Sequence, residues 1–167
     1  MAASNGGYYT GDFSFAGQLT GNLALVKAGA GIQFISGVNS YTGGTSITGG
    51  TVQTNNTNAL GNGMPVSLSN IAGTQLKLLN DLTIGSLSGG GTTGGNVDLG
   101  STFKLTVGGD NRSTVYGGVM SGAGSLTKNG SGNFGLLGAN TFSGGTTLSS
   151  GTIGAYNNAG FGSGAVT

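Results

Sequence analysis

The chain has 167 residues, of which 39 are Gly; Gly, Ser, Thr and Asn together occupy 94 positions, while only nine residues are charged. Globular domains carry about 25% charged residues and about 7% Gly, so a conventional charged surface is excluded. The irregular spacing of Gly and the single proline, Pro65, exclude collagen. The net charge of +1 argues against disorder by charge repulsion. The five cationic residues are scattered, so we expect no nucleic-acid partner.

The length suits one domain or part of a longer array. The first five residues lack the basic and apolar regions of a signal peptide, so we expect a cytosolic chain or a piece cut from a secreted precursor. No run approaches the 18 or more apolar residues of a membrane helix. Cysteine is absent, so disulfides give no information about the redox compartment.

Short runs in which apolar and polar residues alternate occur along the chain, each bounded by Gly, Asn, Ser or Asp. This period of two predicts half-buried β-strands, with the intervening Lys and Asp facing outward. The clearest runs are at 23–25, 66–68, 76–78, 82–84, 97–99 and 103–107. Each Gly costs a helix about 1 kcal/mol relative to Ala, so we predict an all-β chain.

The sequence repeats itself at an offset of 101 residues. Aligning 15–66 with 116–167 without a gap gives 16 identities in 52 pairs. The strongest matches join 25–31 to 126–132, 37–45 to 138–146 and 50–52 to 151–153. We therefore interpret 1–167 as a single segment with one repeat unit at about 6–107 and an incomplete second unit at 108–167.

Short strands, frequent turn residues and internal repetition indicate a solenoid, in which each coil packs only on its neighbours. At about 20 to 25 residues per coil, the chain makes roughly seven coils of a right-handed parallel β-helix. Strands stacked ~4.8 Å apart give a rod ~30 to 35 Å long. Gly and Asn suit its sharp corners, and Thr and Val suit its pleated faces. We expect uncapped ends to expose unpaired backbone groups.

The repeat has a recognisable pattern. Residues 122–153, and more loosely 22–52, follow G-x-G-x-L-T-K-x-G-x-G, then L-x-G-x-N-T-[YF]-[TS]-G-G-T-T and G-T-[LVI]. In this pattern the chain resembles the autotransporter passenger-associated β-strand repeat of type V secretion, whose passengers are adhesin-like. The motif positions are Lys27, Gly29, Gly31, Gly37, Asn39, Tyr41, Gly43, Gly44, Thr45, Lys128, Gly130, Gly132, Gly138, Asn140, Phe142, Gly144, Gly145 and Thr146.

The first copy departs from the pattern at two places. Its residues 21–23 replace the G-x-G, and Gln33 stands where the second copy has Phe134, with Phe34 shifted by one. A one-residue shift turns a side chain to the other face of the strand, so the sequence does not decide which side chains of this strand face inward. The family's signal sequence and C-terminal membrane barrel are not in this sequence, so the resemblance implies a fragment of a passenger.

The supply of catalytic groups is small. Asp12, Asp81, Asp98 and Asp110 are the only carboxylates, and the chain has no His. Acid–base chemistry on polysaccharides needs clustered acids, so we expect no enzyme, no cofactor and no metal site. A fragment of a polysaccharide-acting β-helix enzyme stays a remote alternative. We expect Asp81 and Asp110 in turns and Asp98 outward on a strand.

Three patterns imitate ligand sites. The run 89–95 is similar to a nucleotide loop, but no Gly-Lys-Ser/Thr follows, so we interpret it as a flexible turn. Calcium-binding β-rolls need Asp after each Gly pair, and only 108–110 complies. Threonines such as Thr45 and Thr146 recur as in ice-binding helices, but at 101 residues rather than one coil, which argues against ice binding.

The sharpest recurring positions are Asn39 and Asn140, each followed two residues later by Tyr41 or Phe142. One interpretation is that the aromatic rings bind sugars. We favour another, in which Asn closes a turn through hydrogen bonds from its side chain to the backbone. The aromatic ring then lies inside or beside the coil.

Lys27 and Lys128 end two of the predicted strands, and we interpret them as solvated strand-end residues rather than ligands. Replacing Lys128, Asp98 or Asp110 by Ala is then expected to leave the fold and secretion nearly unchanged. Replacing Gly144 or Gly145 by Val is expected to damage both.

The leading functional hypothesis is a structural repeat segment of a secreted bacterial autotransporter passenger, displayed at the cell surface, that supports passenger folding and secretion. The resemblance implies the translocator barrel of the full-length protein as a partner. The alternative is an adhesive surface that binds itself, as a homo-oligomer or fibre, or binds host surface, matrix or glycans.

Overall fold

The computed structural model describes residues 12–167, which contain seventeen β-strands and no helix. The strands are β1 Phe13–Phe15, β2 Leu25–Lys27, β3 Ile32–Ile35, β4 Thr45–Ile47, β5 Thr51–Thr54, β6 Val66–Leu68, β7 Gln75–Leu78, β8 Leu82–Thr83, β9 Leu87–Gly89, β10 Asn96–Asp98, β11 Lys104–Val107, β12 Thr114–Tyr116, β13 Met120–Ser121, β14 Ser125–Lys128, β15 Asn133–Leu136, β16 Thr146–Leu148 and β17 Thr152–Ala155. They are short because turn-forming residues interrupt each apolar alternation. The predicted all-β class is confirmed.

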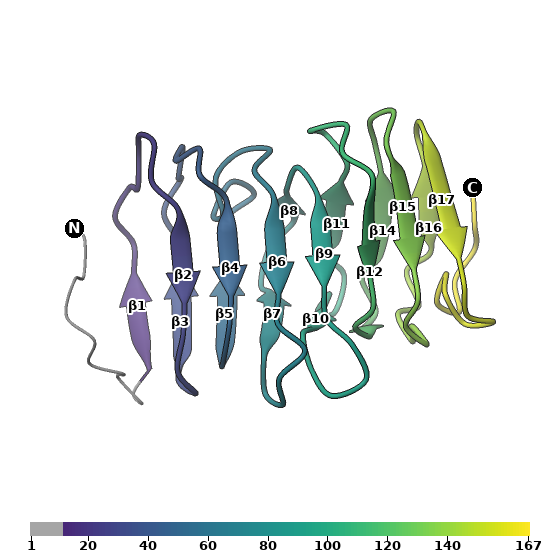
Figure 1. Ribbon diagram of the computed structural model, residues 1–167, viewed down its shortest axis with the longest axis horizontal. Helices are drawn as coiled ribbons and strands as arrows, with labels where there is room; N and C mark the ends of the chain where they lie inside the picture. Colours follow the sequence, from purple (N-terminus) through teal and green to yellow (C-terminus); the bar gives the residue numbers. More distant parts are fainter. Residues whose placement is uncertain (1–11) are drawn as a thin grey trace.

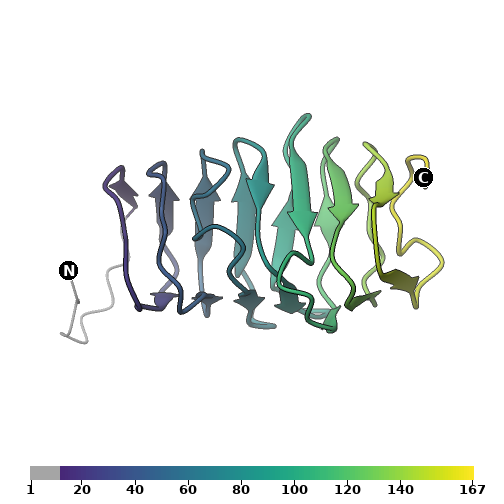
Figure 2. The same cartoon turned by 90° about the horizontal axis from the view of Figure 1, so that it is seen from above.

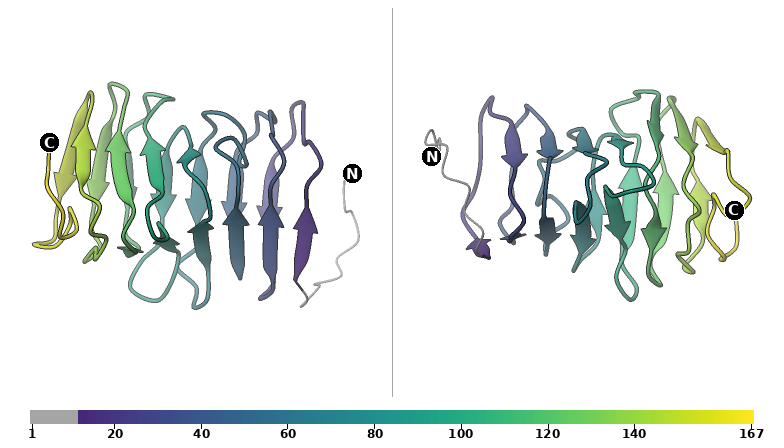
Figure 3. Two further views of the ribbon diagram at one scale, coloured as in Figure 1. Left: turned by 180° about the vertical axis from the view of Figure 1, so that it is seen from behind. Right: turned by 60° about the horizontal axis from the view of Figure 1, so that its bottom comes forward.

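The strands form three parallel sheets that run the length of a rod (Figure 1). Sheet A has the order β1-β3-β5-β7-β10-β13, sheet B the order β2-β4-β6-β9-β12-β15-β17, and sheet C the order β8-β11-β14-β16. Adjacent strands of a sheet come from successive coils, and every pair is parallel. Strands β1 and β17 lie near opposite ends, and Figures 2 and 3 show the same succession of coils from other sides. The predicted solenoid of about seven coils is confirmed.

The wall of the rod changes along its axis. The first three coils place one strand in sheet A and one in sheet B, with a strandless arc between them. From β7 to β15 each coil visits sheet A, sheet C and sheet B in that order. The last coil places β16 in sheet C and β17 in sheet B. The rod therefore has three faces, but only the coils between β7 and β15 place a strand on each of them.

Columns of inward side chains form one continuous core. Val52, Leu76 and Val97 stack across sheet A, and Leu105 stacks on Leu126 in sheet C, all fully buried. Full burial of each such side chain contributes about 1.5–3 kcal/mol of transfer free energy. Because each side chain in a column contacts only the coils before and after its own, every added coil contributes its own share of the stability.

Charged side chains occupy some of the outward positions, as predicted. Lys77 on β7 lies opposite Asp98 on β10, with its Nζ 3.4 Å from the Oδ2 atom of Asp98. Lys104 on β11 is exposed. An ion pair at a surface of this kind contributes about 0–1 kcal/mol, so these charges add little to the stability of the stack.

The strand register shows which side chains of β3, in the first copy, face inward. Gln33 lies opposite the fully buried Val52, so it occupies an inward column, and Phe34 lies opposite Gln53 in an outward column. In the second copy the buried Phe134 occupies the inward position. The apolar residue of the first copy is therefore displaced by one position to the outside.

Candidate functional site

The two copies of the repeat occupy different faces of the solenoid. The first copy passes through sheets B, A, B and A in β2, β3, β4 and β5, whereas the second passes through sheets C, B, C and B in β14, β15, β16 and β17. Since the chain visits the sheets in the order A, C, B, each element of the second copy lies one face earlier than its counterpart. The offset of 101 residues is therefore not a whole number of coils.

The register also corrects the end of the sequence alignment. Thr45 pairs with Val66, and Thr146 forms a bridge with Val166. The second copy thus has one residue fewer before this position. The ungapped match of Val66 with Thr167 is wrong.

A strandless arc, 36–44, carries an asparagine that joins three coils of the first copy. The Oδ1 atom of Asn39 accepts a hydrogen bond from the backbone N–H of Leu19 at 2.7 Å, in the preceding coil. Its Nδ2 donates to the carbonyl of Ala59 at 2.6 Å, in the following coil. The amide replaces part of the hydrogen bonding that a strand would supply on this face.

The second copy repeats this arrangement in the arc 137–145. The Oδ1 atom of Asn140 accepts from the N–H of Met120 at 2.7 Å, and its Nδ2 donates to the carbonyl of Gly160 at 2.6 Å. Both asparagines are buried. The bonds run from side chain to backbone, as predicted, but they join residues 20 positions apart instead of closing one turn.

The aromatic residues of the arcs point into the rod. Tyr41 is 1% exposed and Phe142 is fully buried. The hydroxyl of Tyr41 is hydrogen-bonded to Oγ1 of Thr45. Burial raises the pKa of Tyr41 to about 12, and the bond with Thr45 partly offsets that rise. The interpretation of these rings as sugar platforms is wrong, because neither ring is open to solvent.

Lys27 caps a corner of the first copy. It ends β2 in an inward column, opposite the fully buried Ile47. Its Nζ donates to the carbonyls of Ala28 at 3.0 Å and Gly29 at 2.8 Å, and to that of Gly49 at 2.9 Å in the next coil. An ammonium has three donors, so each of them has an acceptor here.

Lys128 caps the matching corner of the second copy. It ends β14 opposite the buried Val107. Its Nζ donates to the carbonyls of Asn129, of Gly130 at 2.9 Å and of Ser150 at 3.4 Å, the last in the next coil. The charge is satisfied by turn carbonyls rather than by a carboxylate in contact with it.

The prediction of a solvated side chain is wrong for Lys128, whereas Lys27 is only partly buried; the strand-end position is correct for both. Lys128 is only 1% exposed. Burial lowers the pKa of the Lys27 ammonium and that of Lys128, and in Lys128 the charge of Asp110 acts in the opposite direction. The expectation that Lys128→Ala is harmless no longer holds, because the change uncaps three carbonyls.

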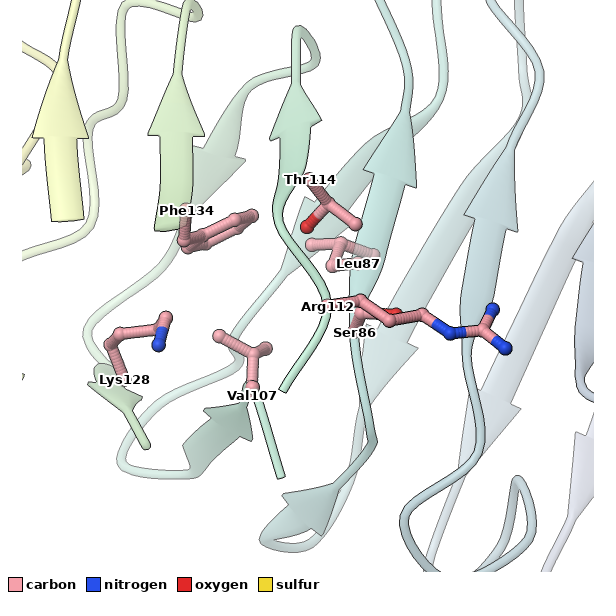
Figure 4. Close-up of a pocket in the computed structure, with 8 residues that line it drawn as sticks. Ser86, Leu87, Val107, Arg112, Thr114, Lys128 and Phe134 are labelled. Atoms are coloured by element: carbon pink, nitrogen blue, oxygen red, sulfur yellow. The ribbon is translucent and has the colours of Figure 1, made fainter. Parts of the chain in front are cut away.

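Asp110 lies in a turn, as predicted, and supports the second corner. Its carboxylate accepts hydrogen bonds from the Oγ of Ser86 at 2.7 Å and from the N–H of Arg112 at 3.2 Å. Ser86 is buried, so the Asp110→Ala change is not neutral either. Figure 4 shows the pocket beside this corner, into which Lys128 and Phe134 face while the guanidinium of Arg112 points away. The pocket is too narrow to admit a water molecule, so it offers no ligand site.

The other carboxylates lie apart from one another. Asp98 faces outward on β10, as predicted, and Asp81, predicted in a turn, lies between the bend at 79–80 and β8. Across residues 12–167, no three potential metal ligands of the His, Cys, Asp or Glu type come together. The same stretch contains no helix that is long and apolar enough to span a membrane.

The glycine pairs of the arcs allow neighbouring coils to approach closely. A Cβ atom on Gly144 would lie 2.5 Å from the carbonyl oxygen of Gly124. Gly145 has φ +90°, a conformation that strains any other residue. Gly43 and Gly44 form the same pair in the first copy, with φ +80° at Gly44. These contacts support the expected sensitivity to valine at Gly144 and Gly145.

Sequence reasoning missed a set of Asx residues, themselves outside 25–53 and 126–154, whose side chains link successive coils. Oδ1 of Asp81 accepts from the N–H of Lys104 at 2.9 Å, and Oδ1 of Asn96 accepts from that of Val119 at 3.0 Å. Further bonds of this kind join Ile32 to Asp12, Thr93 and Gly94 to Asn70, and Ser131 to Asn111. Each amide lies 20 to 24 residues after its acceptor. The donors are backbone amides of different residue types, so no side-chain pattern in the sequence marked these links.

Comparison with known proteins places the same two stretches in one family. The family described as passenger-associated-transport-repeat matches residues 25–53 and 126–154, which contain all the motif positions named above. Over 142 residues, or 84% of its length, the chain is 42% identical to the Adhesin BmaC autotransporter of Brucella suis biovar 1 (strain 1330), and the match spans 4% of that protein. No solved structure matches the chain. The resemblance is therefore confirmed: the chain carries two passenger-associated transport repeats and is similar along most of its length to a segment of an autotransporter adhesin.

Proposed function

We propose that the chain is a structural stretch of a secreted adhesin passenger, which folds coil by coil after crossing the outer membrane and displays other parts of the protein at the cell surface. The observation that carries this proposal is the pairing pattern. Each strand pairs only with strands of adjacent coils, so each new coil can fold on the one already formed. The translocator barrel of the full-length protein is the partner that the proposal requires.

Stepwise folding supplies a direction for transport. A coil that folds outside the membrane buries apolar columns and satisfies its backbone groups, and it then resists return through a narrow passage. The repeats support this folding in the strandless arcs, where Asn39 and Asn140 supply hydrogen-bond partners for backbone groups of the neighbouring coils. The absence of Cys is compatible with passage as an extended chain, since no disulfide can lock it beforehand.

Surface display of the full-length protein tests this role. The variants Asn39→Ala and Asn140→Ala, made together, are expected to lower the amount of passenger that external protease can reach on intact cells. Asn55→Ala with Asn133→Ala is the matched control, because both residues are exposed. Equal display of the two double variants would contradict a role of the repeats in secretion.

A second candidate function is adhesion through the outer face of sheet B. Apart from the inward Lys27, no strand of this sheet contains a charged residue. Its outward positions include Ser46, Ser67 and Ser88 in one column. Val115 and Tyr156, which are 51% and 75% exposed, lie on β12 and directly after β17. A neutral face of this kind suits association with a second copy, with a host matrix or with glycans.

Sedimentation at increasing concentration separates the two functions. A pure spacer stays monomeric, whereas an adhesive face gives concentration-dependent association that Tyr156→Ser weakens. Seven strands ~4.8 Å apart and about four residues wide offer roughly 400 Å², which is well below the ~800 Å² per partner of a stable interface. Any association of this segment alone is therefore expected to be weak.

A further inference from the structure

We infer that each repeat is a register clamp, which holds the coils inside the repeat at 19 or 20 residues and does so on whichever face it occupies. The clamp consists of Lys27 and Asn39 in the first copy and of Lys128 and Asn140 in the second. The inference concerns the fold itself, so it stands or fails independently of any role in secretion.

Coil length is most regular inside the repeats. Four strand pairs have both strands within one repeat, and two more join the preceding coil to the second strand of a repeat: β2–β4, β3–β5, β14–β16 and β15–β17, then β1–β3 and β12–β15. Their paired residues are 19 or 20 positions apart in the sequence. In the other eight strand pairs the separation is 21 to 27. One of these is β11–β14, with a separation of 21, so Lys128 does not fix the coil that precedes it. Regular coil length is thus a property of the repeats, not of the solenoid as a whole.

The hydrogen bonds explain this regularity. Each asparagine amide connects to residues 20 positions before and 20 positions after it. Each lysine ammonium connects to a carbonyl 22 positions later. One extra residue in such a coil would displace the bonded backbone group by about 3.3 Å along the strand direction, beyond hydrogen-bonding distance. The two side chains therefore fix the coil at two separate corners.

The chemistry of the contacts explains why the clamp works on different faces. All the hydrogen bonds made by the asparagine amides and lysine ammonium groups go to backbone N–H or C=O groups. Every coil offers such groups, whatever its side chains. The clamp therefore does not require particular side chains in the neighbouring coils. The first copy lies in sheets B and A and the second in sheets C and B, yet both make the same hydrogen bonds.

Engineered disulfides provide a direct measure of register, because the chain has no native Cys. Thr127→Cys with Thr147→Cys reports a clamped pair, β14–β16, and Ser67→Cys with Ser88→Cys reports an unclamped pair, β6–β9. In a Lys128→Met, Asn140→Ala background, we expect the clamped pair to cross-link about tenfold more slowly, in line with the loss of buried hydrogen bonds. The unclamped pair is expected to cross-link at its original rate.

Two outcomes would overturn the inference. An unchanged rate at 127–147 would show that the coil keeps its register without the clamp. Loss of cross-linking at both pairs would show a general loss of fold rather than a loss of register. Lys104→Met with Asn133→Ala serves as the matched background, since both residues are exposed and neither side chain has a protein hydrogen-bond partner in the described structure.

A segment exchange tests portability separately. Residues 25–53 are replaced by the sequence of 126–154, which has the same length but comes from different faces. We expect a folded chain in which Cys residues at 26 and 46 cross-link at the rate seen without the exchange. The matched control places 75–103, an equally long connecting stretch, at 25–53 and is expected to abolish that cross-link. An exchanged chain that loses it as well would show that the clamp is specific to its face.

Discussion

Asn39 and Asn140 make the same pair of side-chain hydrogen bonds on different faces of the rod. Each accepts from an amide 20 residues before it and donates to a carbonyl 20 residues after it. The equivalence is therefore one of local hydrogen bonding, not of position around the axis. Copies at an offset of 101 residues can present their outward side chains in different directions while they hold the coils in the same way.

The first prediction concerns Asn39→Asp. The acceptor for Leu19 is kept, but a carboxylate oxygen then faces the carbonyl of Ala59 in place of the Nδ2 donor. We expect a loss of about 2–4 kcal/mol in the free energy of unfolding at neutral pH. Burial raises the pKa of such a carboxyl in the folded state, so stability is recovered below that pKa and lost as the pH rises through it. Urea unfolding at about pH 4 and about pH 7 measures the difference.

The control for this change is Asn55→Asp. Asn55 is exposed, and its side chain forms no hydrogen bond within the described structure. Its variant is expected to stay within about 0.5 kcal/mol of the original chain at both pH values. A similar pH dependence in both variants would assign the effect to net charge rather than to the bridge.

The second prediction concerns the lysine corner. Lys128→Met keeps the aliphatic chain but leaves the carbonyls of Asn129, Gly130 and Ser150 without the ammonium. We expect a loss of about 1–3 kcal/mol in unfolding free energy. Lys104→Met, at an exposed position, is expected to change stability by less than about 0.5 kcal/mol. Guanidinium unfolding of both variants checks this, and equal stabilities would show that the corner does not need its cation.

The third prediction concerns close approach between coils. Gly144→Val places side-chain atoms against the backbone of Gly124, which cannot move without shifting its own coil. A Cβ atom on Gly109 meets no atom within 4 Å. We therefore expect Gly144→Val to lower the melting temperature strongly, with a loss on the order of 3 kcal/mol or more, and Gly109→Val to be tolerated. Circular dichroism melting compares them, and matched melting curves would contradict the contact.

The positions of strands could be predicted because the inward columns require a period of two. The predicted run at 66–68 coincides with β6, and that at 103–107 contains β11. Lys27 lies two residues after Leu25, so the same period reaches it as an inward position, although we predicted it to be solvated. The inward position was not predicted because a lysine usually faces solvent. The three carbonyls that accept its hydrogen bonds also come from two coils, which the sequence does not show to be adjacent.

The face of each copy could not be predicted from the sequence. Face depends on the summed lengths of all coils between the copies, and these range from 19 to 27 residues. Irregular loops set most of that range. The coil from β9 to β12 is an example, because it contains the Gly-rich stretch 89–95. The sequence of this stretch does not indicate how many residues the coil needs. The repeats were visible because their bonds need particular side chains, whereas the loops need only turn residues.

The fourth prediction concerns alkaline pH. Burial raises the pKa of Tyr41 from 10.0 to about 12 and also raises that of Tyr116, whose hydroxyl donates to the carbonyl of Gly95 at 2.8 Å. The folded state therefore favours the neutral phenols. Their contribution to stability is complete below pH 10 and is lost as the pH rises toward about 12. The lowered pKa values of Lys27 and Lys128 act in the opposite sense over lower pH values.

Tyr41→Phe isolates one of these phenols. Phe142 fills the equivalent place in the second copy, so the ring without its hydroxyl fits this environment. We expect the variant to fold at neutral pH and to lose less stability than the original chain between about pH 10 and about pH 12. Urea unfolding at several pH values, with tyrosinate absorbance followed in parallel, measures the shift. Tyr156→Phe, at a 75% exposed position, is the control. If both variants followed the original pH curve, ionisation of Tyr41 would not limit alkaline stability.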